Sequence, residues 1–290
     1  MGGRSPACDA RRGMSAQRIA VSARTIVDGC FDAAGTAELE TVYDVGLALG
    51  VPEQTVRLAI RRMQAAGELR QIGRGRSGRL ERTASGAANA RRDEELVSFA
   101  FAQDAGDFPW DGRWRLAAFS APESERRERD AIRTCLTALG AVSIAAGLYV
   151  SPHDLVDDLN AALSVDVVAR RVTTASTTDL VIPGCAGPMD IAERLWPAAT
   201  TRSAYTPLVA ELDAFDSTDR ETLSEWSEVE VLAWSLRLSE GLDRALRVDP
   251  LLPGELRAGP WEPAAVRSRL VAAWTALERL APTLPVFRAP

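Results

Sequence analysis

Histidine and cysteine are both scarce in this chain. The 290-residue sequence holds one histidine, His153, which leaves little material for histidine-based catalysis or for a histidine-rich metal site. The four cysteines are Cys8, Cys30, Cys135 and Cys185. They lie far apart and form no Cys-x-x-Cys pair, which argues against both a zinc knuckle and a disulfide framework. We therefore expect a protein without a metal or a cofactor, in a reducing, cytoplasmic setting.

Long apolar runs are also missing. No stretch approaches the roughly 18 residues needed to cross a bilayer, and the apolar run at 141–150 suits buried strands instead. Residues 1–17 lack the apolar core of a signal peptide. We expect them to form a flexible basic tail, with Met14 as an alternative natural start.

Lysine is absent, so arginine carries the positive charge, and its distribution is uneven. The net charge is −6. Residues 1–92 hold 15 arginines against 9 acidic residues, a net of +6, whereas residues 93–290 hold 19 arginines against 31 acidic residues, a net of −12. This split predicts a polyanion-binding N-terminal module joined to a regulatory or oligomerising body.

Three helices are predicted within the basic module. Residues 22–35 begin with a serine at a plausible N-cap, and residues 37–50 end in a glycine where a C-cap glycine belongs. Residues 51–67 carry Pro52 in the first turn and Gly67 at the end. A helix, a glycine turn and a second helix are the layout of a helix-turn-helix, in which the third predicted helix would read DNA.

The third predicted helix has an apolar and a polar side. At about 100° per residue, Val56, Ala59, Ile60 and Met63 gather on one face, which predicts contact with the core. The opposite side and its flanks offer groups that can donate to base edges and phosphates. These predicted DNA contacts are Gln54, Thr55, Arg57, Leu58, Arg61 and Arg62.

A hairpin is predicted directly after this helix. Residues 68–72 and 79–83 alternate like short strands, and the glycine-rich GRGRSG between them predicts a turn. Glycines let a backbone approach a phosphate, and arginines neutralise it. We therefore expect a wing whose DNA contacts are Arg74, Arg76 and Arg79, and a winged helix-turn-helix domain over residues 18–92. Residues 93–108 are expected to be a linker.

The middle of the chain, residues 109–185, predicts a ferredoxin-like domain. Its pattern gives the order β-α-β-β-α-β. The predicted elements are a strand at 113–120, a helix at 123–140, two strands within 141–152, a helix at 153–163 and a strand at 165–174. The fold class expected for the whole chain is therefore α+β.

This middle stretch resembles a known family. WDGRWRLAAFSAPESERRERDAIRTCLTALGAVSIAAGLYVSP at 110–152 is similar to the central domain of the PaaX family, bacterial transcriptional regulators named for the repressor of phenylacetate degradation. The SAR at 22–24 and the DPLLP at 249–253 fit the same family. The resemblance implies a dimeric winged-helix repressor with a ferredoxin-like centre and a helical C-terminal domain. It also implies an aryl-acyl-CoA thioester as effector.

The acidic remainder, residues 186–290, predicts a helical bundle for dimerisation or effector binding. Its predicted helices are 187–197, 206–216, 223–246 and 261–280. All seven tryptophans lie beyond residue 109, and we expect some of them to fill cores. With nearby arginines, an aromatic side chain can also line an effector pocket. The residues predicted for such a pocket are Arg113, Trp114, Arg115, Arg170 and Arg171.

Two classes of function fit this organisation. The first, which we favour, is a DNA-binding regulator that is not an enzyme: a homodimeric repressor on an inverted repeat of double-stranded DNA, released by a small-molecule effector. The second is a metal-dependent nuclease, because ferredoxin-like domains of this type resemble a small CRISPR-adaptation nuclease. In that case Asp111 would be a metal ligand. The sequence shows no nucleophile–base pair or phosphate-binding glycine motif that would support an enzyme.

Overall fold

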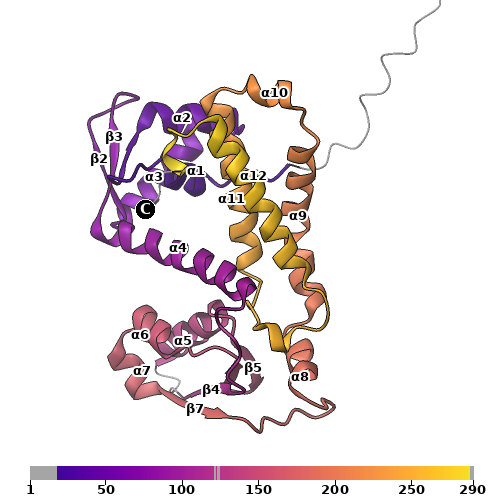
Figure 1. The fold of residues 1–290 in the computed structure, drawn as a ribbon. Coiled ribbons are helices and arrows are strands. Elements are labelled where there is room, and N and C mark those ends of the chain that lie inside the picture. Colours follow the sequence, from indigo (N-terminus) through magenta and orange to yellow (C-terminus); the bar gives the residue numbers. More distant parts are fainter. Residues whose placement is uncertain (1–17, 121, 123–124, 288–290) are drawn as a thin grey trace, which may run out of the picture. The chain divides into compact units, whose positions relative to one another are not determined.

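The computed structural model describes residues 18–120, 122 and 125–287 as an α+β protein with two small antiparallel sheets. The chain divides into two compact units. The first contains the described residues of segments 1–87, 206–241 and 269–290, and the second contains 88–205 and 242–268 (Figure 1). Within the described ranges, no helix has the length and apolar character needed to span a membrane.

The N-terminal part of the first unit alternates short helices and strands. Its elements are α1 (Ala23–Gly29), β1 (Thr36–Glu38), α2 (Leu39–Ala48), α3 (Glu53–Ala65), β2 (Leu69–Ile72) and β3 (Arg79–Arg82). The Ser22 hydroxyl caps α1 by accepting a hydrogen bond from the Thr25 amide at 3.1 Å. Gly50 (φ +72°) ends α2 in the left-handed region, and the Val51 amide reaches back to the Gly46 carbonyl at 2.8 Å. The turn between α2 and α3 is thus set by local signals.

The close approach of α2 and α3 depends on a glycine at the contact. A Cβ built at Gly46 would lie 3.2 Å from Cγ2 of Val56, so a larger residue there would push the two helices apart. On α3, Val56, Ile60 and Met63 are buried, as the helical periodicity predicts. The polar side of α3 therefore faces solvent.

The first sheet has the strand order β1-β3-β2. β2 and β3 form the hairpin, with Leu69 opposite Arg82 and Ile72 opposite Arg79. β1 pairs with β3 and places Ala37 opposite the buried Leu80. The sequence predicts helix at 37–38, but a strand is found there. Three residues are too few to show an alternating pattern, so only the pairing with β3 reveals this strand.

The C-terminal helices also contribute to the first unit. They are α9 (Ala198–Asp216), α10 (Arg220–Ser224), α11 (Glu228–Leu246) and α12 (Glu262–Leu280), followed by the 3-10 turn η4 (Pro285–Phe287). Residues 231–236 of α11 are buried at six consecutive positions, as in a helix surrounded by its core. The Ser22 amide donates to Glu240 at 3.1 Å, and a Cβ at Gly29 would lie 2.1 Å from Leu236. Within this unit, α1 therefore packs directly on α11.

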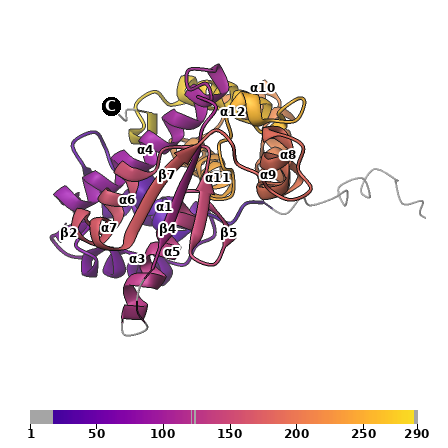
Figure 2. The ribbon, with the colours of Figure 1, turned by 90° about the horizontal axis from the view of Figure 1, so that it is seen from below.

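The second unit is built on the four-stranded sheet. Its elements are α4 (Ala84–Ala105), β4 (Trp114–Phe119), α5 (Arg126–Ala138), β5 (Val142–Ala145), β6 (Leu148–Ser151), α6 (Val156–Leu163), α7 (Val165–Arg171), β7 (Val172–Thr177), α8 (Pro188–Leu195) and the 3-10 turn η3 (Gly254–Leu256). The strand order is β5-β6-β4-β7 with every pair antiparallel (Figure 2). This order agrees with that expected of a ferredoxin-like domain.

Both faces of this sheet are covered. Ala117 and Tyr149 lie on the face that packs against α5, α6 and α7, through residues such as Leu136. Trp114 and Val150 lie on the opposite face with residues of α8 and η3. Alternate residues of β4 therefore serve two separate apolar clusters.

Further segments differ from the sequence-based prediction. Residues 165–171, predicted as strand, form α7, because Ser164 caps a helical turn and Val168 is buried; the strand starts at Val172. Most of the predicted linker 93–108 is helical, since α4 continues to Ala105. α9 starts at 198 instead of 206 and contains a proline in its interior. In α4, burial of Ala100 and Gln103 shows that the segment packs against other residues.

Candidate nucleic-acid interface

All nine predicted DNA contacts are exposed. Gln54, Thr55, Arg57, Leu58, Arg61 and Arg62 lie on α3, Arg74 and Arg76 in the loop between β2 and β3, and Arg79 at the start of β3. The side of α3 that carries them lies opposite its buried apolar residues. The helix therefore presents to solvent the groups that could donate to a duplex.

The structure brings α3 and the hairpin loop together around one hollow. This hollow has a volume of about 230 Å³, and its lining includes Arg57, Arg61 and Gln64 of α3 together with Gln71 and Gly75 of the hairpin. A second hollow lies along the outer side of α3 itself, against residues from Glu53 to Arg61. Two elements predicted to contact DNA thus border a common concave surface.

Five residues from α2, α3 and the loop form a polar cluster, here named the arginine–tyrosine cluster. It consists of Tyr43, Asp44, Glu53, Arg57 and Arg76. Arg57 pairs with Glu53, Arg76 pairs with Asp44, and Arg76 also lies 3.7 Å from Glu53. Both guanidinium carbons lie 5.7 Å from the centroid of the Tyr43 ring. The pairing with Glu53 raises the pKa of Arg57.

Sequence patterns reveal only part of this cluster. The spacing of Glu53 and Arg57 is a recognisable helical i,i+4 pair. Tyr43 reads as an ordinary core position, and it is indeed buried. The partners Asp44 and Arg76 lie 32 residues apart, so no local signal connects them.

Three arginines of this surface are not engaged by carboxylates. Arg61, Arg62 and Arg74 make no ion pair with any carboxylate in the described part of the chain. Their guanidinium groups are exposed and keep their full donor capacity. They are therefore the arginines of this surface most readily available to phosphates.

Arg79 has a different environment. It pairs with Glu81 at 3.0 Å, and Glu81 also pairs with Arg70 of the neighbouring strand. Hydrogen bonds from Arg70 and Arg79 hold the pKa of Glu81 below its usual range. Arg79 and Glu81 flank the buried Leu80 on β3, and Arg70 lies opposite Glu81, so the three side chains occupy the outer face of the hairpin. No contact links Arg79 to the arginine–tyrosine cluster among the residues that the structure describes.

The loop backbone is held at its base and open at its tip. The Gly78 carbonyl accepts a hydrogen bond from the Leu39 amide at 2.9 Å, which fixes the loop to the start of α2. Gly75 adopts φ +67° with no atom within 4 Å of a built Cβ. A left-handed residue in open space favours glycine, and it leaves the backbone accessible to a phosphate.

The predicted effector residues are not brought together. Arg113 and Arg115 line a hollow of about 350 Å³ on the face of the central sheet that also carries Ala117. Trp114 is buried on the opposite face, where its ring stacks on Trp196 at 6.1 Å. Arg170 and Arg171 pair with carboxylates of Glu125 and Glu128 instead.

Polar groups in this 350 Å³ hollow were missed by the sequence analysis. Ser151, Asp154, Thr174 and Ser176 line it beside the arginines. Except for Asp154, they come from β6 and β7, which flank β4 in the sheet. Since these residues meet only through strand pairing, no sequence motif marks them.

Asp111 is engaged by an arginine. Both of its carboxylate oxygens accept from Arg115, at 2.9 and 2.7 Å, and one accepts from the Arg113 amide at 3.0 Å. These hydrogen bonds, chiefly that from Arg115, lower the pKa of Asp111 to about 2. Within the described residues, no group of three or more His, Cys, Asp or Glu side chains is arranged to hold a metal ion.

The structure is therefore that of an α+β protein with an arginine-rich surface formed by a helix and a hairpin. Residues 107–184 match the family model described as the PaaX protein central Cas2-like domain. This match confirms that the middle of the chain resembles the central domain of the PaaX family.

A solved structure shares the fold over most of the chain. It is that of the uncharacterized protein Rv0674 from Mycobacterium tuberculosis, with a TM-score of 0.54, 23% identity, and coverage of 88% of this chain and 94% of that chain. At this identity the likeness concerns the fold alone. The comparison with curated proteins gave no significant match.

Proposed function

We propose that the chain is a DNA-binding transcriptional regulator whose residues 18–92 form a winged helix-turn-helix domain. The element order α1-β1-α2-α3-β2-β3 and the strand order β1-β3-β2 support this assignment. In it, α3 is the recognition helix and the loop between β2 and β3 is the wing. The match of residues 107–184 to the PaaX central-domain model supports the regulatory role.

The observation that carries the proposal is the shared hollow between α3 and the wing. Arg57 and Arg61 face it from α3, and Gly75 faces it from the wing. In this proposal Gln54, Arg57, Leu58 and Arg61 contact base edges in the major groove, while the wing arginines contact phosphates.

A mobility-shift assay with the DNA upstream of the protein's own gene tests this proposal. The double substitution Arg57→Ala/Arg61→Ala should abolish sequence-specific binding, because it removes two donors from the recognition helix. The matched control Arg126→Ala/Arg127→Ala removes the same charge from exposed positions of α5 and should leave binding unchanged. Full specificity in the first variant would refute the assignment of α3.

The remaining domains are assigned from topology and family. We assign residues 109–185 as a ferredoxin-like domain. Its strand order supports this, as does its β-α-β-β-α-β order, in which α6 and α7 together take the place of the second helix. We assign residues 186–290 as a helical domain for dimerisation or effector binding, and residues 93–108 as the linker between the winged-helix domain and the ferredoxin-like domain. A homodimer would place two recognition helices on an inverted repeat. Light scattering and the symmetry of a DNA footprint test this; a monomer with an asymmetric footprint would contradict it.

We further propose a small-molecule effector that lowers DNA affinity, with aryl-acyl-CoA thioesters as the first candidates from the family resemblance. The hollow of the central sheet is the proposed site: Arg113 is exposed and unpaired with any described carboxylate, and Leu155 and Leu159 add apolar lining. Tryptophan fluorescence should report binding, because all seven tryptophans lie outside the winged helix. Arg113→Ala should weaken effector binding and Arg170→Ala should not. The reverse result would place the effector site near Arg170 and not in this hollow.

A further inference from the structure

Two carboxylates are paired with arginines of the proposed DNA-binding surface, where they would repel bound phosphates. Glu53 uses one oxygen for Arg57 of the recognition helix, and its other oxygen lies 3.7 Å from Arg76 of the wing. Arg76 also pairs with Asp44 of α2. Glu53 is thus shared between the recognition helix and the wing, and Asp44 connects the wing to α2.

The environment of these ion pairs allows them to be exchanged. The side chains of Asp44, Glu53 and Arg76 are 45%, 40% and 47% exposed, and pairs this accessible to water are weak. Beneath them, the buried Tyr43 ring provides a fixed surface that both arginines approach equally. The arginines can therefore leave the carboxylates without disturbing the core.

We propose that Asp44 and Glu53 are intramolecular counter-ions for Arg57 and Arg76. In the free protein they hold the wing against the recognition helix, and on binding they release both arginines to the DNA. They thereby lower the affinity of the basic module for duplex DNA of any sequence. This inference rests on the proposed DNA-binding function.

The exchange has a measurable consequence for ion release. A phosphate that takes an arginine from a carboxylate leaves that carboxylate free to recruit a cation from solution, so the net release of ions is reduced. Replacing both carboxylates by amides removes this uptake. The slope of log K against log salt should then become steeper by about 1 to 2.

The test compares two double variants that change the charge equally. Asp44→Asn/Glu53→Gln removes the counter-ions, and Glu38→Gln/Glu40→Gln removes two exposed acids at the start of α2 that have no ion pair among the described residues. On a short random-sequence duplex, the first variant should bind about tenfold more tightly than the second, with the steeper salt slope. If both variants gain the same affinity for DNA, the change in net charge alone explains the gain, and the proposal is overturned.

A measurement without DNA separates this proposal from the function on which it rests. Trypsin cleavage after Arg74 and Arg76, followed by mass spectrometry, reports how firmly the wing is held. Cleavage should be faster in Asp44→Asn/Glu53→Gln than in the wild type and in the control variant. Unchanged cleavage overturns the proposal, whereas faster cleavage in a protein that binds no DNA would support the counter-ion role and refute the proposed function.

Discussion

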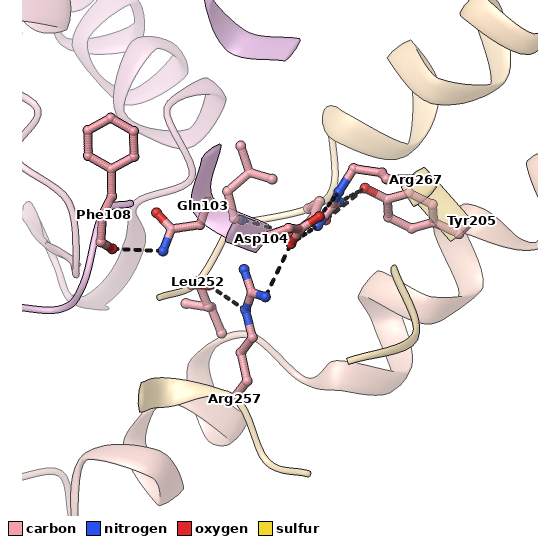
Figure 3. A network of polar contacts seen from close by, with 9 residues as sticks. Gln103, Asp104, Phe108, Tyr205, Leu252, Arg257 and Arg267 are labelled. Carbon is pink, nitrogen blue, oxygen red and sulfur yellow. Dashed lines mark hydrogen bonds and ion pairs between the residues drawn. The ribbon is translucent and has the colours of Figure 1, made fainter. Parts of the chain in front are cut away.

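The guanidinium of Arg267 on α12 makes two hydrogen bonds with the carboxylate of Asp104 on α4, at 2.6 and 2.7 Å (Figure 3). The Arg267 side chain is completely buried, and its remaining nitrogen donates to Asp249 at 2.7 Å and to the Tyr205 hydroxyl. The Tyr205 hydroxyl in turn donates to Asp249 at 2.8 Å. Every nitrogen of the buried guanidinium therefore has an acceptor, as burial of a charge requires.

Removing this arginine should destabilise the protein strongly. Arg267→Met keeps the volume but leaves Asp104 and Asp249 without their shared cation, which typically costs about 3 to 5 kcal/mol for a buried pair. Arg269→Met is the matched control on the same helix, because its partners Asp213 and Asp216 are exposed; it should cost less than about 1 kcal/mol. Urea unfolding measures both. Similar losses in the two variants would contradict the structural role of the buried network.

The salt dependence of DNA binding should report the number of arginine–phosphate contacts. If about six arginines of the winged helix meet phosphates, log K should fall with log salt at a slope near −5. Arg74→Ala should reduce the steepness by about 0.9, since Arg74 is exposed in the wing and has no carboxylate partner in the described ranges. Titrations at several salt concentrations measure both slopes. A flat response in the wild type would remove the DNA-binding assignment.

Local signals in the sequence account for the parts of the fold that were predicted correctly. Glycines at positions 50 and 67 mark the ends of α2 and α3 because both adopt a left-handed conformation there. The GRGRSG loop separates β2 from β3 as predicted. The exposed positions of α3 follow from helical periodicity alone.

Features that depend on distant partners could not be predicted in the same way. β1 is too short to show a period, and only its pairing with β3 defines it. Residues 93–105, predicted as part of a linker, are helical, and Ala100 and Gln103 within them are buried. Arg267 and Asp104 lie 163 residues apart, so their pairing leaves no local pattern. Trp114 lies away from Arg115 because adjacent positions on β4 face opposite sides of the sheet.

A glycine in α4 is required for packing. A Cβ built at Gly86 would lie 2.0 Å from the backbone carbonyl oxygen of Glu68, which has no freedom to move aside. Gly86→Ala should therefore destabilise the protein by about 1 to 3 kcal/mol, although alanine is the better helix former. Gly254→Ala is the control, because a Cβ there meets no atom within 4 Å. Thermal unfolding that shows a stabilised Gly86→Ala variant would contradict this close contact.

The only histidine provides a clean test of pH dependence. The His153 ring is partly buried in the second unit, where Nε2 lies 3.1 Å from the Pro250 carbonyl and the Phe99 ring packs edge-on at 5.5 Å. Burial lowers the pKa of His153 from 6.5, and the hydrogen bonds to backbone carbonyls oppose this shift only partly. The folded state therefore resists a proton that the unfolded state accepts.

The sign of the effect follows from this difference in proton binding. Above the unfolded pKa of 6.5, both states carry a neutral ring and stability does not depend on His153. As the pH falls below 6.5 toward the lower folded pKa, the unfolded state gains a proton first, so the free energy of unfolding decreases. His153→Gln should remove this decrease while its amide can still donate to Pro250. The nearby Asp158 and Arg115 are present in both proteins, so their contributions largely cancel in the comparison. The melting temperatures of the wild type and of His153→Gln should be compared at about pH 7.5, 6.5 and 5.5, the range in which histidine titrates. As the pH falls, the wild type should lose stability faster than the variant. Parallel curves would show that the ring is not held neutral in the folded protein.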